Sequence, residues 1–109
     1  IISDHTVGID IEKISNKTIK IKDKFLDIEL NYPQELNNQI SLVYWNIKES
    51  IYKAVGIAAI DFKKNILALP LDINATKSKS CYVNNHDIYS FETYFRISKN
   101  YTLAFVIKN

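Results

Sequence analysis

The sequence predicts an α+β domain in which an antiparallel sheet packs on one long helix. Residues 89–97 and 101–107 both alternate apolar and polar positions, and the polar segment 98–100 between them suits a tight turn, so this part predicts a hairpin. Apolar residues recur at steps of three and four along residues 40–58, which predicts the helix. Alternation at residues 7–12 predicts one further strand ahead of it.

The predicted helix has two unlike faces. Pro33 keeps the preceding residue out of the helical region, so the helix starts near Gln34, and it ends at Val55 with Gly56 as a left-handed cap. One face is an apolar stripe that would be buried, made of Ile40, Val43, Tyr44, Ile47, Ile51, Ala54, Val55 and Ala58.

The other face of this helix carries Glu49, which has Trp45 and Tyr52 as neighbours and Lys53 one turn later. A Glu–Lys pair four residues apart is also an ordinary surface pair that supports a helix by about 0.2–0.5 kcal/mol. The helix alone therefore leaves open whether Glu49 is structural or functional.

The opening strand places two carboxylates side by side. Gly8, Asp10 and Glu12 share one face, with the Cα atoms of Asp10 and Glu12 about 7 Å apart. Like charges that close repel each other unless a cation lies between them. The other face of the strand is formed by Val7, Ile9 and Ile11.

Two interpretations fit this carboxylate pair: a solvated strand end, or half of a site for a hard cation. Asp10 and Glu12, joined by Glu49 of the helix, would offer three carboxylate oxygens to an ion such as Mg²⁺, which takes further ligands from water and substrate phosphate. Gly8 leaves room beside them for a ligand or another backbone.

The remaining segments are predicted as shorter pieces. Residues 20–30 show a modest helical pattern, 57–65 form a connector, and 66–69 form a short strand that Pro70 confines to an edge. Residues 75–80 are predicted as a polar loop, 81–83 as a short strand and 84–87 as a turn.

Composition limits the class of protein. With 109 residues, 47% of them hydrophobic and 24% charged, the chain is expected to form a single globular domain, residues 1–109. It has no membrane-spanning apolar run and no visible secretory signal, and its one cysteine, Cys81, suits a reducing cytoplasm. The two glycines exclude a phosphate-binding P-loop. His5 and His86 are interpreted as polar loop residues.

The net charge of +2 is too small to indicate a nucleic-acid-binding protein. A local basic stretch could still attract an acidic protein or a phosphate-rich ligand, although a solvated surface explains it as well. This stretch comprises Lys13, Lys17, Lys20, Lys22 and Lys24.

Two motifs together resemble a known family. Gly8-Ile9-Asp10-Ile11-Glu12 followed by Trp45-Asn46-Ile47-Lys48-Glu49-Ser50 resembles the paired signature of the 4'-phosphopantetheinyl transferases of the surfactin-synthetase-activating type. Lys53 and the segment Leu69-Pro70-Leu71-Asp72 extend the likeness over nearly the whole chain. The resemblance implies half of a pseudo-dimeric fold, and transfer of phosphopantetheine from coenzyme A to a serine of an apo acyl or peptidyl carrier protein.

The resemblance also implies roles for individual residues. Mg²⁺ would be held by Asp10, Glu12 and Glu49 and would bind the pyrophosphate of coenzyme A. Glu49, directly or through a water, would take the proton of the serine, and Lys53 would pair with a phosphate oxygen. Lys48 is expected to help bind coenzyme A, and Glu29 to be a supporting residue. Trp45 is expected to wall the site.

The sequence opens at Ile1-Ile2 without methionine and lacks the Ser-His-Ser-like motif of the upstream half of this family. We therefore expect either the C-terminal half of a two-half enzyme or a short form that self-associates. Two other functions stay open: a non-catalytic half that binds a metal or a partner, and a small basic interaction domain whose carboxylates are merely solvated.

Overall fold

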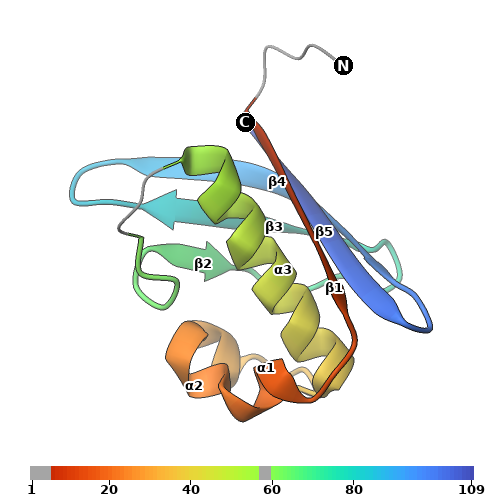
Figure 1. Cartoon of the computed structure of the whole chain (residues 1–109). Coiled ribbons are helices and arrows are strands. Elements are labelled where there is room, and N and C mark those ends of the chain that lie inside the picture. Colours follow the sequence, from red (N-terminus) through yellow and green to blue (C-terminus); the bar gives the residue numbers. More distant parts are fainter. Residues whose placement is uncertain (1–5, 57–59) are drawn as a thin grey trace.

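The computed structural model describes residues 6–56 and 60–109. A curled, five-stranded antiparallel sheet of order β1-β5-β4-β3-β2 packs against the long helix α3, which confirms the α+β prediction (Figure 1). The elements are β1 (Val7–Lys13), α1 (Lys17–Lys20), α2 (Lys22–Phe25), the 3-10 helix η1 (Ile28–Asn31), α3 (Asn38–Val55), β2 (Ile66–Ala68), β3 (Lys77–Val83), β4 (Ile88–Ile97) and β5 (Tyr101–Lys108).

Helix α3 begins later than predicted and ends where predicted. The side chain of Asn37 accepts a hydrogen bond from the backbone N–H of Ile40 at 2.8 Å and so caps the start of the helix. Gly56 closes it with φ 72°, in the left-handed region. Of the predicted stripe, Ala58 lies outside the described residues, Ala54 and Val55 are partly buried, and the rest is buried, namely Ile40, Val43, Tyr44, Ile47 and Ile51.

Strand β1 turns its polar face, rather than its apolar face, toward α3. Gly8 and Asp10 are buried, whereas Val7, Ile9 and Ile11 are 54%, 59% and 57% exposed. Gly8 makes this arrangement possible, because a Cβ atom at this position would lie 1.9 Å from the backbone oxygen of Ser50. The strand therefore lies directly on the helix, with its carboxylates at the contact.

The C-terminal hairpin is confirmed: β4 and β5 pair antiparallel, with Phe95 opposite Ala104. The polar loop predicted at 75–80 is wrong, because β3 starts at Lys77 and pairs with β4 along its whole length. Ser80 of β3 can be buried because its hydroxyl group has a hydrogen-bond partner, the Thr93 hydroxyl of β4, with the two oxygens 2.6 Å apart.

The segment between β1 and α3 forms three short turns of helix, α1, α2 and η1, instead of one continuous helical piece. Helices α1 and α2 lie beside the start of α3 (Figure 1), and the Thr18 and Ser41 hydroxyl oxygens meet there at 2.9 Å. Phe25 and Leu26 enter the common core. No helix in residues 6–56 and 60–109 has both the length and the apolar character that crossing a membrane requires.

Candidate functional site

The carboxylate of Asp10 lies at the contact between β1 and α3, and α3 provides a partner for each of its oxygens. Asn46 donates its side-chain N–H to Oδ2 at 2.9 Å. The Lys53 ammonium lies 2.8 Å from Oδ1. Asp10 is 5% exposed, so its charge is compensated by these two groups rather than by bulk water.

Lys53 is the most exposed member of this set. Its side chain is half exposed, and its Nζ also donates to the backbone oxygen of Ile9 at 3.3 Å. The hydrogen bond to Asp10, more than any other effect, raises the pKa of Lys53. Because the Lys53 side chain is half exposed, its ammonium can leave Asp10 and pair with another anion.

Glu49 is half-buried on the same side of α3. The pKa of its carboxyl group is raised, most strongly by burial and then by the charge of Asp10. The charge of Lys53 lowers this pKa, and the charge of Glu12 raises it by a smaller amount. The charges of Asp10 and Glu12 thus act on Glu49, and the Lys53 charge counteracts them. A carboxyl group with a raised pKa can accept and release a proton closer to neutral pH than an ordinary glutamate.

Glu12 is half-buried and lines a cavity of about 180 Å³ with Trp45 and Leu42. Trp45 packs edge-on against Phe25, with ring centroids 5.2 Å apart, and lies 5.5 Å from the ring of Phe62. The indole therefore forms an apolar wall beside Glu12.

The donor chemistry of these side chains fits a hard cation, because carboxylate oxygens are the ligands that Mg²⁺ prefers. In the described part of the chain, no three His, Cys, Asp or Glu side chains converge closely enough to hold a metal ion in their present rotamers. Lys53 holds one of the required oxygens.

Lys48 and Glu29 form a separate, buried ion pair. The Lys48 side chain is fully buried, and its Nζ lies 3.1 Å from Glu29 Oε2 and donates to the backbone oxygens of Phe62 and Ile66 at 2.8 Å each. Burial lowers the pKa of Lys48, and the Glu29 charge opposes that shift. The expected contact of Lys48 with coenzyme A does not fit this geometry, because its three N–H donors are already used.

Glu29 was expected to be a supporting residue, and the contacts agree with that role. Besides Lys48, it accepts the backbone N–H of Asp27 at 2.9 Å and of Ala68 at 3.0 Å. The pair therefore connects η1, α3 and β2 behind the site.

Sequence reasoning missed three polar residues of the hydrogen-bonded network that holds Asp10, namely Asn46, Ser50 and Thr102. Asn46 is fully buried and receives a hydrogen bond from the Thr102 hydroxyl. The Ser50 hydroxyl lies 2.7 Å from the backbone oxygen of Asn46 and 3.0 Å from that of Ala104. A signal was present, because positions 46, 49, 50 and 53 follow helical steps and form one polar stripe.

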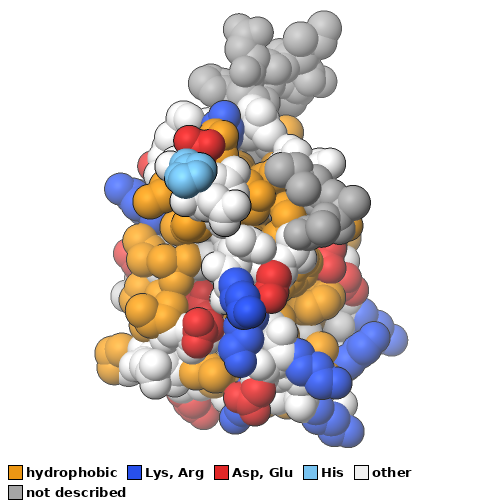
Figure 2. Space-filling view, turned by 90° about the vertical axis from the view of Figure 1, so that its left-hand side faces the viewer, with side chains coloured by type: hydrophobic (Ala, Val, Ile, Leu, Met, Phe, Trp, Pro, Cys, Tyr) orange, Lys and Arg blue, Asp and Glu red, His pale blue; other side chains and the backbone are white. Residues whose placement is uncertain are grey.

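The surroundings of the site are charged but not of one sign. In Figure 2 basic side chains gather at the lower right, at the end where α1 and α2 lie in Figure 1, with acidic side chains beside them at the same end. Lys17 and Lys20 belong to α1, and Lys22 and Lys24 to α2. His86 is exposed in the turn before β4, and His5 lies outside the described residues.

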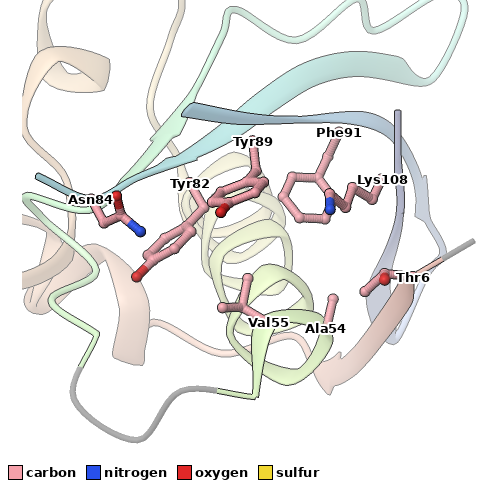
Figure 3. Close-up of a pocket in the computed structure, with 8 residues that line it drawn as sticks. All are labelled: Thr6, Ala54, Val55, Tyr82, Asn84, Tyr89, Phe91 and Lys108. Carbon is pink, nitrogen blue, oxygen red and sulfur yellow. The ribbon is translucent and has the colours of Figure 1, made fainter. Parts of the chain in front are cut away.

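A second cavity, of about 270 Å³, lies between the end of α3 and the strands β3 and β4 (Figure 3). Tyr82 and Tyr89 stack there with ring centroids 6.0 Å apart, and the Lys108 ammonium lies 4.8 Å from the centre of the Tyr89 ring. None of the predicted site residues lines this cavity.

Comparison with known proteins agrees with the motifs. A family model described as the 4'-phosphopantetheinyl transferase superfamily matches residues 6–106. The 4'-phosphopantetheinyl transferase gsp of Aneurinibacillus migulanus is 46% identical to this chain over 61 residues. That alignment covers 50% of this chain and 25% of the relative, so the match spans a quarter of the relative's length.

Proposed function

Because the chain belongs to the 4'-phosphopantetheinyl transferase superfamily, we propose that it takes part in moving the 4'-phosphopantetheine group of coenzyme A onto a serine of an apo acyl or peptidyl carrier protein. The observation that carries this proposal is the meeting of Asp10 of β1 with Glu49 and Lys53 of α3. A carboxyl group can accept a proton, and a partly exposed ammonium can stabilise negative charge on a transferred phosphate, which are two of the tasks that phosphoryl transfer requires.

The reaction places a proton on Glu49. The serine oxygen bonds to the phosphorus that carries pantetheine, and the bond from that phosphorus to the bridging oxygen breaks. Glu49 accepts the serine proton, and adenosine 3',5'-bisphosphate leaves with the electron pair. The half-buried position of Glu49, close enough to Asp10 and Lys53 to interact with both charges, supports its place at the reacting groups.

Asp10, Glu12 and Glu49 would hold Mg²⁺, and their oxygen ligands fit that ion. When bound, the ion neutralises charge on the pyrophosphate. Lys53 would then release Asp10 Oδ1 and pair with a phosphate oxygen. Its half-exposed side chain supports this exchange. Trp45 would limit the access of water beside Glu12.

The basic surface of α1 and α2 would attract the partners. Coenzyme A carries several phosphates and carrier proteins are acidic, so both would be steered to Lys17, Lys20, Lys22 and Lys24. Such steering weakens with added salt.

A second candidate function is a binding half that holds a cation or a partner without turnover. The outer face of the sheet, which points away from α3, supports it. Val7, Ile9 and Ile11 are exposed there, and their opposite residues on β5 are also apolar, namely Ile107, Phe105 and Leu103. Exposed apolar surface of this kind is typical of an interface, which suits either a preceding half of a pseudo-dimer or self-association.

Incubating the chain with coenzyme A, Mg²⁺ and an apo carrier protein tests the proposal, with the carrier measured by intact mass. We expect the carrier to gain one phosphopantetheine group. Glu49→Gln should slow transfer by about 10²–10⁴-fold, the usual effect of a general base. Glu35→Gln, at an exposed position before α3, is the matched control and should be as active as the wild type.

If Mg²⁺ changes the Trp45 fluorescence but the carrier gains no mass, the binding half is the better description. Transfer that is unchanged in Glu49→Gln would refute the role of this residue.

A further inference from the structure

Asp10 is held by a neutral, buried amide as well as by Lys53. Asn46 Nδ2 donates to Asp10 Oδ2 at 2.9 Å, while Oδ1 receives the Lys53 ammonium. Oδ1 therefore points toward the partly exposed side of the site and Oδ2 toward the interior. A carboxylate with one oxygen bound to a fixed donor cannot rotate freely about its Cβ–Cγ bond.

The Asn46 amide is itself oriented by Thr102 of β5. The Thr102 hydroxyl donates to Asn46 Oδ1, so the N–H₂ group must face Asp10. Asn46 and Thr102 are both fully buried. Thr102, Asn46 and Asp10 form a chain of hydrogen bonds from β5 through α3 to β1. In the described residues, every buried side-chain polar atom has a hydrogen-bond partner.

The backbone around the amide is also fixed. Ser50 Oγ lies within hydrogen-bond distance of the carbonyl oxygens of Asn46 and Ala104, and thereby joins α3 to β5 next to Thr102. The Asn46 side chain thus projects from a helix turn that Ser50 ties to β5.

We infer that Asn46, oriented by Thr102, is a positioning residue that fixes the Asp10 carboxylate so that Oδ1 is presented to the partly exposed side of the site, where Lys53 now binds it. This inference rests on the proposed function, because it assigns Oδ1 as the oxygen that Asp10 offers to the cation. Groups that orient a ligating side chain in this way change metal affinity by about 10–100-fold when removed.

Thr102→Val tests the inference, because it keeps the side-chain shape and removes only the donor that orients Asn46. The measurement is titration calorimetry of the 109-residue chain with Mg²⁺, alongside thermal unfolding. We expect Mg²⁺ to bind 10–100-fold more weakly to Thr102→Val and to Asn46→Leu. Thr102→Ser, which retains the hydroxyl, is the matched control and should bind Mg²⁺ as the wild type does.

The double variant Asn46→Leu/Thr102→Val separates positioning from stability. In Asn46→Leu the buried Thr102 hydroxyl loses its acceptor, and the added Thr102→Val change removes that hydroxyl. The double variant should therefore regain this part of the thermal stability that Asn46→Leu loses, but not the part due to Asp10 Oδ2, which still lacks its donor. Its Mg²⁺ affinity should stay as low as that of Asn46→Leu. Recovery of affinity together with stability would overturn the inference.

The inference and the proposed function can fail separately. Wild-type Mg²⁺ affinity in both single variants, with a wild-type chain that binds Mg²⁺ and modifies the carrier, overturns the role of Asn46 alone. A wild-type chain that neither binds Mg²⁺ nor modifies the carrier overturns both.

Discussion

Glu49 combines partial burial with two carboxylate neighbours, and this has a consequence for stability. Its pKa is raised in the folded protein, chiefly by burial and then by the charge of Asp10. The charged form is therefore less favourable in the folded state than in the unfolded state. The free-energy cost of charging Glu49 in the folded protein applies fully when the pH is above the pKa of Glu49 in the folded state. This cost shrinks as the pH falls through that pKa, and it is absent below the pKa of Glu49 in the unfolded state.

We accordingly expect Glu49→Gln to unfold at a higher temperature than the wild type at pH 7, although it loses transfer activity. The difference should close as the pH is lowered toward 4, where the wild-type side chain is itself protonated. Thermal unfolding of both proteins across this range measures the effect. A constant difference at all pH values would show that the gain does not come from the Glu49 charge.

Lys48 gives a second prediction at this scale. Replacing it by Met leaves the Glu29 carboxylate buried without its cation, which typically costs about 3–5 kcal/mol. Urea unfolding measures the loss. The double variant Lys48→Met/Glu29→Gln carries no buried charge and should recover part of it. If Lys48→Met were as stable as the wild type but bound coenzyme A more weakly, the structural role of this residue would be wrong.

Individual residues of the site could be predicted only where a motif marked them. Strand alternation and the two motifs point to Asp10, Glu12 and Glu49 as candidates, whose role stays a prediction. Nothing in the sequence links Asn46 to Thr102, because their hydrogen bond joins positions 56 residues apart in the chain. Lys48 shows the reverse limit. A lysine next to Glu49 invites a functional role, and only the three-dimensional contacts with Glu29, Phe62 and Ile66 show that its donors are used elsewhere.

At the level of elements, the contact between β1 and α3 decides the geometry of the site, and Gly8 controls that contact. The nearest atom to an added Cβ is the Ser50 backbone oxygen at 1.9 Å, which cannot turn aside as a side chain can. Gly8→Ala must therefore push the strand from the helix.

We expect Gly8→Ala to destabilise the fold by about 3 kcal/mol, at the upper end of the usual cost of overpacking, and also to weaken Mg²⁺ binding because Asp10 moves with the strand. Gly56→Ala is a useful comparison. It meets no atom within 4 Å, and its cost of about 1–2 kcal/mol comes from the left-handed backbone alone. Urea unfolding should therefore rank Gly8→Ala below Gly56→Ala in stability, and the opposite order would contradict the close contact.

The alternation of residues 7–12 predicted the strand but not which of its faces is buried. Apolar residues usually face the core, yet Ile9 is exposed and Asp10 is inside. The reason lies outside the strand, because α3 supplies Asn46 and Lys53 to receive Asp10. The hairpin of β4 and β5 was easier to predict, since a short turn brings neighbouring segments together.

At the scale of the whole molecule, the exposed apolar face of the sheet predicts that copies of the chain associate. It consists of Val7, Ile9, Ile11, Leu103, Phe105 and Ile107, and the rings of Tyr94 and Phe105 stack on the same side, 5.0 Å apart. An isolated chain that exposes this surface should associate with a second copy.

Sedimentation velocity over a range of concentrations tests this. We expect the wild type to shift from monomer toward dimer as its concentration rises, and Ile9→Lys/Phe105→Lys to remain monomeric and folded, because both side chains are more than one-third exposed. Ile28→Lys, at an equally exposed apolar position on η1, is the control and should associate as the wild type does. A wild type that stays monomeric at every concentration would contradict the prediction.

Strand β1 lies at the edge of the sheet and pairs only with β5, so the first described residues of the chain are held by the last. The backbone N–H of Lys108 bonds to the oxygen of Thr6 at 2.8 Å. During synthesis on the ribosome, Asp10 would emerge about ninety residues before Thr102. Thr102 is the residue that orients Asn46, the amide partner of Asp10. A nascent chain can therefore not complete this site until β5 has been made, because β5 supplies both the Thr102 hydroxyl and the strand that pairs with β1.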